Sequence, residues 1–207
     1  MVGRIANSIP SGRHNTGLSD YFHLVDIPAR QVARYVAVIG PSRATPAVAA
    51  AAFQVGVLIA RGGANLVCGG GGGAMEAACR GARSAGGTTV GILPGPTRED
   101  ANPFVDIAIP TGMGEARNAL VVRAADAVIA VGGGAGTLSE IGLALKMGRP
   151  VIGLGTWEVA PPPGGTVDTA IERVASPEAA VRAALAPADS AVLPSTPESS
   201  SPGRLPK

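Results

Sequence analysis

Residues 126–145 read DAVIAVGGGAGTLSEIGLAL, and they decide how the rest of the chain is interpreted. The stretch opens with an apolar run over 127–131, which is typical of a buried parallel strand. It then breaks at three glycines, and apolar residues return at helical spacing at Leu138, Ile141 and Leu145. Glycines at such a turn let backbone amides approach a ligand, and a helix start adds unpaired N–H groups with partial positive charge. The stretch therefore predicts a binding site for an anion, most often a phosphate.

A second unit of the same design precedes it. Residues 65–68 are typical of a strand, five consecutive glycines follow, and 74–85 favours a helix. Further strands are expected at 35–40, 88–93, 105–109 and 150–154, and further helices at 47–60, at 114–125 and after Ser176. This alternation predicts an α/β, Rossmann-like, doubly wound parallel sheet of about six to seven strands in three layers, α/β/α. Both glycine turns fall at carboxyl ends of strands, where ligands of such sheets bind.

The chain divides into one domain with two tails. We expect a flexible N-terminal extension over residues 1–33, a nucleotide- or phosphate-binding domain over 34–186, and a disordered Ser/Pro-rich tail over 187–207. Residues 161–165 are typical of a linker or surface loop. Both histidines, His14 and His23, fall in the extension, where a solvated residue is favoured over a metal ligand or a general base.

Composition excludes several classes of function. The chain has 207 residues, 46% apolar and 15% charged, which is enough to build a core. Aromatic residues make up only 3% and the net charge is +2, so neither nucleic acid nor a membrane surface is an expected partner. Without a membrane-length apolar run or a signal-peptide pattern, we expect a cytoplasmic protein. Cys68 and Cys79 are interpreted as small buried hydrophobic residues, and no metal site is expected.

The glycine loops match no common nucleotide motif well. Neither loop ends in the Gly-Lys-Ser/Thr of a P-loop, and the first is a degenerate dinucleotide pattern whose following strand ends without an acid. The glycines could serve only to permit tight turns. Two such loops in one domain favour a ligand.

Glu140 has two interpretations. Residues 137–140, Thr-Leu-Ser-Glu, fit a capping box, in which Thr137 caps the helix and Glu140 reaches back to the cap amide. The alternative is a functional carboxylate beside a phosphate at the helix start. The pattern alone favours the capping box.

Two arginines follow carboxyl ends of predicted strands. Arg43 comes after the first strand, and Arg117 lies near the start of the helix predicted after residue 109. A surface ion pair is the ordinary role of an arginine. The planar fork of its guanidinium also suits phosphate.

These motifs resemble a known family. Residues 132–140 resemble the P-G-G-x-G-T-x-x-E motif of the LOG phosphoribohydrolases of the SLOG superfamily. The likeness is closer to its molybdenum-cofactor-carrier-like branch, through GGGGG-x-M-E-A at 69–77, T-G-x-G-x-A-R-N at 111–118 and G-G-G-x-G-T-L-S-E-I at 132–141.

The resemblance implies an activity. LOG enzymes cleave the N-glycosidic bond of a nucleoside 5′-monophosphate without a cofactor, and their catalytic arginine and glutamate fall on Arg117 and Glu140. This sequence departs from them at Ala116, Asn118 and Gly132, and its first glycine loop is one residue shorter. These departures count against hydrolysis and leave phosphate binding in place. Lysine decarboxylation is excluded, because pyridoxal phosphate needs a lysine and Lys146 lies at the far end of its helix.

The resulting prediction is a protein that binds a phosphate-bearing small molecule, either a nucleotide or a molybdenum-cofactor-type pterin. The alternative is a LOG-like phosphoribohydrolase with Arg117 and Glu140 as catalytic residues. The resemblance also implies a homodimer or homotetramer, and the helix bearing Leu120, Val121 and Val122 is apolar enough to form an interface. The predicted ligand-binding residues are Gly40, Arg43, Gly69, Gly70, Gly71, Gly72, Gly73, Met75, Arg117, Asn118, Gly132, Gly133, Gly134, Gly136, Thr137 and Glu140.

Overall fold

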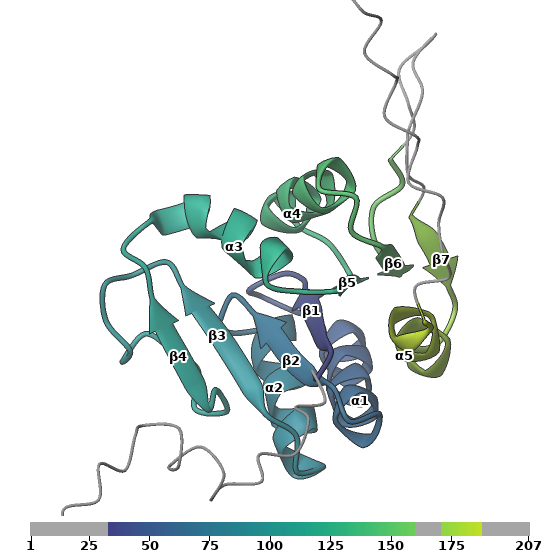
Figure 1. Ribbon diagram of the computed structural model, residues 1–207, viewed down its shortest axis with the longest axis horizontal. Coiled ribbons are helices and arrows are strands. Elements are labelled where there is room, and N and C mark those ends of the chain that lie inside the picture. Colours follow the sequence, from purple (N-terminus) through teal and green to yellow (C-terminus); the bar gives the residue numbers. More distant parts are fainter. Residues whose placement is uncertain (1–32, 160–170, 188–207) are drawn as a thin grey trace, which may run out of the picture. The chain divides into compact units, whose positions relative to one another are not determined.

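The computed structural model describes residues 33–159 and 171–187 (Figure 1). The predictions for the two tails, for both histidines and for the loop at 161–165 lie outside these residues. The strands are β1 (Tyr35–Ile39), β2 (Asn65–Cys68), β3 (Thr89–Leu93), β4 (Ile107–Pro110), β5 (Ala127–Val131), β6 (Val151–Leu154) and β7 (Glu172–Val174). The helices are α1 (Pro46–Arg61), α2 (Ala74–Ser84), the 3-10 helix η2 (Gly114–Arg117), α3 (Asn118–Arg123), α4 (Ala135–Lys146) and α5 (Pro177–Leu185).

The seven strands form one sheet in the order β4-β3-β2-β1-β5-β6-β7, and every neighbouring pair is parallel. From β1 the chain first builds outward through β2, β3 and β4, and then returns to place β5 on the other side of β1. The order therefore reverses between β1 and β5, and a crevice opens there beyond the strand ends. The predicted Rossmann-like parallel sheet is confirmed.

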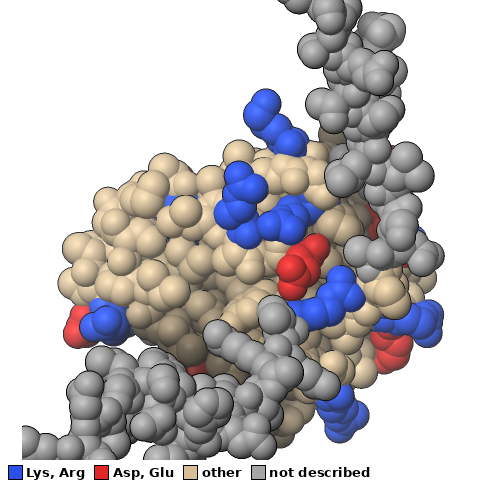
Figure 2. Space-filling view, viewed as in Figure 1, with Lys and Arg blue, Asp and Glu red and all other residues tan. Residues whose placement is uncertain are grey.

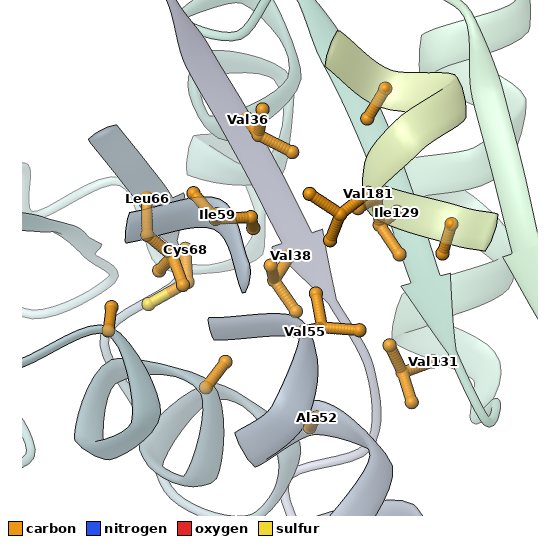
Figure 3. Packing of buried hydrophobic residues seen from close by; sticks show 14 of the residues in the cluster. Val36, Val38, Ala52, Val55, Ile59, Leu66, Cys68, Ile129, Val131 and Val181 are labelled. Carbon is orange, nitrogen blue, oxygen red and sulfur yellow. The ribbon is translucent and has the colours of Figure 1, made fainter. Parts of the chain in front are cut away.

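Two apolar layers cover the sheet, because successive side chains of a strand point to opposite faces. Val36 and Val38 of β1 pack with α1, α2 and α5, as Figure 3 shows, whereas Ala37 and Ile39 pack with α3 and α4. Cys68 and Cys79 are both buried in the first layer as free thiols, with 3.5 Å between their Sγ atoms. The prediction that they act as small core residues is confirmed.

Helices α1 and α2 approach so closely that glycine is required at their contact. A Cβ on Gly56 would lie 2.0 Å from the carbonyl oxygen of Ala78, and a Cβ on Gly81 would lie 2.0 Å from that of Phe53. Neither backbone can move without separating the helices. This contact fixes α2, and with it the end of the first glycine loop.

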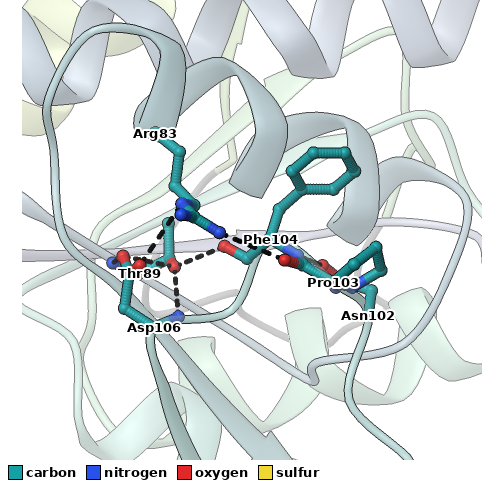
Figure 4. Close-up of polar contacts among 6 residues, drawn as sticks. All are labelled: Arg83, Thr89, Asn102, Pro103, Phe104 and Asp106. Atoms are coloured by element: carbon teal, nitrogen blue, oxygen red, sulfur yellow. Dashed lines mark hydrogen bonds and ion pairs between the residues drawn. The ribbon is translucent and has the colours of Figure 1, made fainter.

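Strand β4 begins two residues later than the sequence predicts. The residues before it bind Thr89 instead: its hydroxyl donates to the Phe104 carbonyl at 2.7 Å, and Asp106 Oδ2 accepts from the Thr89 amide at 2.9 Å (Figure 4). Arg83 reaches the same carboxylate, with 3.3 Å between Nε and Oδ1. These polar contacts end the loop and start the strand.

The predicted helix at 114–125 is divided. Residues 114–117 form the 3-10 helix η2, and α3 follows as a separate short helix. Val121 and Val122 of α3 are fully buried in the core, so only Leu120 of that predicted interface remains exposed. Much of the surface over α3 and β4 in Figure 2 is uncharged. Ile107 and Ile109 of β4 are exposed, as is Met113 in the loop that follows. The oligomeric state stays a prediction.

No helix within residues 33–159 and 171–187 combines the length and apolarity that a membrane crossing needs. Lys146 is the last residue of α4. At about 1.5 Å per residue, the helix separates it from the glycine turn by roughly 16 Å. Its predicted place at the far end of the helix is confirmed.

Candidate functional site

A cavity of about 330 Å³ lies where the strand order reverses, at the carboxyl ends of β1 and β5. Four segments surround it: the loop after β1, the start of α2 with Met75, the 3-10 helix η2 with the start of α3, and the first turns of α4. Its lining residues are Gly40, Pro41, Ser42, Arg43, Met75, Glu115, Arg117, Asn118, Gly134, Ala135, Gly136, Thr137 and Glu140.

Glycines allow the loop after β1 to pack closely against the neighbouring elements. A Cβ on Gly40 would lie 2.6 Å from the carbonyl oxygen of Val131, so the loop passes directly beside the end of β5. The carbonyl of Pro41 accepts a hydrogen bond from the Ala74 amide at 3.0 Å. Gly73 has φ +65°, and a Cβ on it would lie 2.4 Å from the same carbonyl oxygen. The first glycine loop thus anchors the wall of the cavity.

Helix α4 begins at Ala135, three residues earlier than a capping box with Thr137 as N-cap requires. Gly134 is its N-cap in an extended conformation, and no side chain caps the helix. Thr137 lies inside the first turn, 2% exposed, and its hydroxyl has no hydrogen-bond partner in the described part of the chain. The capping-box interpretation is wrong, and the free amides of this first turn border the cavity instead.

Arg117 is held inside the molecule at the end of η2, only 8% exposed. One Nη1 hydrogen bond goes to the side-chain oxygen of Asn118, and Nη1 lies 3.8 Å from Glu140 Oε1. Its Nε has no hydrogen-bond partner among the described residues. A Cβ on Gly69 would lie 2.7 Å from Nη2, so glycine at this position makes room for the guanidinium.

Glu140 faces the cavity from α4 and is 7% exposed. Its removal from water raises its pKa to about 7, although Arg117 acts to lower the pKa and Glu115 raises it further. The carboxyl is therefore about half protonated at neutral pH. Asn118 links Arg117 to Glu115, because its side-chain oxygen accepts from Arg117 Nη1 and its Nδ2 lies 3.5 Å from Glu115 Oε2.

The structure brings together most of the predicted site. Gly40, Arg43, Met75, Arg117, Asn118, Gly134, Gly136, Thr137 and Glu140 all line the cavity. Gly69 to Gly73, Gly132 and Gly133 do not line it, and the role predicted for them in holding phosphate stays a prediction. The sequence interpretation omitted Pro41, Ser42 and Ala135, although their places directly after β1 and β5 were a usable signal.

Comparisons with known proteins agree with this architecture. The SLOG cluster4 family model matches residues 33–182, and the chain belongs to this family. The molybdenum cofactor binding protein of the phototrophic bacterium Rippkaea orientalis is 40% identical, with a TM-score of 0.65 over 72% of this chain and 93% of that one.

Two further relatives extend the comparison. The molybdenum cofactor carrier protein MCP of Chlamydomonas reinhardtii is 36% identical, with a TM-score of 0.66 over 73% of this chain and 95% of its own. An uncharacterized protein of Archaeoglobus fulgidus is 48% identical over 119 residues, which is 58% of this chain and 78% of that protein. The predicted resemblance to the SLOG superfamily and its carrier-like branch is confirmed.

Proposed function

We propose that this protein binds a phosphate-bearing small molecule in the cavity between β1 and β5, with the phosphate at the start of α4. The observation that carries the proposal is a pair of buried polar atoms without partners, Arg117 Nε and Thr137 Oγ1, on residues that line the cavity. A buried donor left unpaired costs about 1–3 kcal/mol. A phosphate oxygen offers each of them an acceptor.

The local charges favour the same ligand. The first turn of α4 presents unpaired amides at the positive end of a helix of twelve residues. Arg117 adds a buried cation, and the exposed Arg43 lies at the cavity wall. A charged Glu140 would repel the anion. Its carboxyl is largely neutralised once an anion is bound beside it, because a nearby negative charge raises the pKa of a carboxyl.

Molybdenum cofactor is the first candidate ligand, because two solved relatives are described as binding or carrying it. The residues present fit its phosphate end. Neither Cys68 nor Cys79 lines the cavity, so the site offers no thiolate to the metal. A nucleotide satisfies the same phosphate contacts, and the cavity volume is large enough for either.

A phosphoribohydrolase is the alternative, and one arrangement favours it. Glu140 and Glu115 both line the cavity, and a carboxyl whose pKa lies near 7 suits acid–base work at neutral pH. Arg117 would orient the phosphate. The binding role is preferred because the sequence departs from the hydrolase motifs at Ala116, Asn118 and Gly132, whereas the phosphate contacts are common to both roles.

Replacing Thr137 by valine tests the proposal. Valine keeps the shape of threonine and removes an unpaired buried hydroxyl, so we expect T137V to unfold at the same or a higher urea concentration than wild type. We also expect it to bind ribose 5-phosphate about three- to tenfold more weakly, as for the loss of one hydrogen bond to a charged group. Isothermal titration of the full chain measures the affinity.

Thr89→Val is the matched control. Thr89 is also buried, but its hydroxyl donates to the Phe104 carbonyl at 2.7 Å, and neither residue lines the cavity. We expect T89V to lower stability and leave affinity unchanged. Equal affinity of T137V and wild type, or no binding of ribose 5-phosphate by wild type, would overturn the proposed phosphate position.

A further inference from the structure

Trp157 is the only tryptophan of the chain, and it lies against the glycine turn that begins α4. After β6 the chain turns at Gly155, which has φ +59°, and returns toward the end of β5. The indole Nε1 donates to the Gly134 carbonyl at 3.1 Å. A Cβ on Gly133 would lie 2.7 Å from the same nitrogen, so glycine there lets the indole lie directly on the backbone.

The main effect of this hydrogen bond is to hold the indole in place, because α4 does not need it as a cap. The Gly134 carbonyl already accepts the Leu138 amide at 3.0 Å, the first bond of α4. The bond from Trp157 is therefore an additional one. It orients a large aromatic ring beside the proposed phosphate position while leaving 42% of the residue exposed.

A second cavity, of about 340 Å³, lies on this side of the turn. It is lined by Gly133, Gly155, Thr156, Trp157 and Glu158. Glu158 is engaged by Arg173, with 3.0 Å between Oε1 and Nη1. Thr156 Oγ1 has no hydrogen-bond partner within residues 33–159 and 171–187. The indole face and the unpartnered Thr156 hydroxyl are thus the groups that this cavity offers to a ligand.

We propose that Trp157 is the stacking platform for the planar heterocycle of the ligand whose phosphate binds at the start of α4. The inference rests on the proposed function. Gly134 lines the first cavity and Gly133 lines the second, so the two cavities are bordered by adjacent residues of the same turn. A nucleotide or a phosphorylated pterin carries its ring a short linker away from its phosphate, so one molecule reaches both cavities.

Stacking on an aromatic side chain is tolerant of ring identity, because every base presents a π face. The platform therefore selects for a ring of this class and leaves the choice of heterocycle to other groups. Two parts of the site thus bind two parts of one ligand: the start of α4 binds the phosphate, and Trp157 binds the ring.

The test compares two probes that differ only in the ring, AMP and ribose 5-phosphate. Trp157 is the sole source of tryptophan emission, so its fluorescence reports on this side chain alone. We expect AMP to quench the emission of the full-length wild type and to bind about ten- to a hundredfold more tightly than ribose 5-phosphate. Short incubations and chromatography confirm that the AMP stays intact.

Two variants assign the effect to the ring. We expect Trp157→Ala to lose most of the preference for AMP while ribose 5-phosphate affinity, measured by titration calorimetry, changes less than about twofold. Trp157→Phe keeps a ring without the N–H and should retain most of that preference.

Other outcomes overturn the inference. If wild type binds both probes with equal affinity, or if W157A keeps the preference for AMP, Trp157 is not a stacking platform. Equal weakening of both probes in W157A makes Trp157 a support for the turn only. If wild type binds AMP but not ribose 5-phosphate, the phosphate site fails, whereas a lost ring preference with intact ribose 5-phosphate binding contradicts the stacking role alone.

Discussion

Arg117 and Glu140 face each other inside the protein at 3.8 Å between Nη1 and Oε1, a distance too long for a hydrogen bond. Both side chains are only 9% exposed. Burial of the carboxyl therefore outweighs the attraction of the arginine, and the pKa of Glu140 rises to about 7. A buried pair held apart in this way is poorly compensated in the absence of a ligand.

The first prediction concerns stability against pH. In the unfolded chain the pKa of Glu140 is about 4.5, so between about pH 4.5 and 7 the folded state holds a proton that the unfolded state has lost. Stability conferred by this group falls as pH rises through that window, by about 3 kcal/mol. Glu140→Gln removes the titration. Urea unfolding should show the two proteins similar near pH 5 and the variant more stable near pH 8.

A capping glutamate would behave in the opposite way. It would stabilise the helix in its charged form, and E140Q would then be the less stable protein at high pH. A difference between the two proteins that does not change with pH would also contradict the burial argument.

The second prediction concerns Gly69. A Cβ at this position would lie 2.7 Å from Arg117 Nη2 and 3.0 Å from Met75 Sδ. Gly69→Ala should therefore displace the guanidinium, costing about 1–3 kcal/mol of stability and weakening ribose 5-phosphate binding. Chemical unfolding and titration calorimetry measure the two effects.

Gly142→Ala is its matched control. A Cβ on Gly142, inside α4, would meet nothing within 4 Å. The substitution should stabilise the protein by about 0.5–1 kcal/mol, as expected for glycine in a helix, and leave binding unchanged. If G69A bound ribose 5-phosphate as well as G142A, the close contact would have no functional meaning.

The layout of the fold could be predicted because it depends on patterns that are local in sequence. Buried β-branched runs and the glycines after them located six of the seven strands and both turns. The pattern did not predict β7, because this strand has only three residues, of which Glu172 and Arg173 are exposed and show no apolar alternation.

The details of the site could not be predicted in the same way. A capping box at Thr137 is a sound local pattern, but the extended Gly134 starts the helix earlier and turns the hydroxyl toward the cavity lining. Arg117 was expected near a phosphate, but its burial depends on Gly69, which is far away in sequence. Such contacts are set by tertiary packing, which no short motif encodes.

The third prediction separates binding from hydrolysis. Under the proposed function, wild-type protein incubated overnight with AMP returns the nucleotide intact, and chromatography detects no free adenine. Release of adenine by wild type, lowered about a hundredfold or more in E140Q, would instead establish the hydrolase with Glu140 as its acid–base group. A cytokinin-type nucleotide should be run beside AMP, since an enzyme of this class could reject adenine.

The fourth prediction follows from placing a phosphate beside Glu140. Near pH 7 the carboxyl is about half protonated, and the charge of a bound phosphate raises its pKa further, so binding takes up as much as about half a proton. Near pH 5 the carboxyl is already protonated, and the uptake disappears. Titration of ribose 5-phosphate in buffers of different ionisation enthalpy measures the protons exchanged.

E140Q supplies the reference for this measurement. The second ionisation of the phosphate itself, near pH 6, contributes equally to both proteins, so the difference between wild type and E140Q isolates the carboxyl. We expect that difference to be largest near pH 7 and the affinity of wild type, relative to E140Q, to fall as pH rises from about 6 to 8. Identical proton exchange in the two proteins would mean that the bound phosphate lies away from Glu140, and the start of α4 would then not be its position.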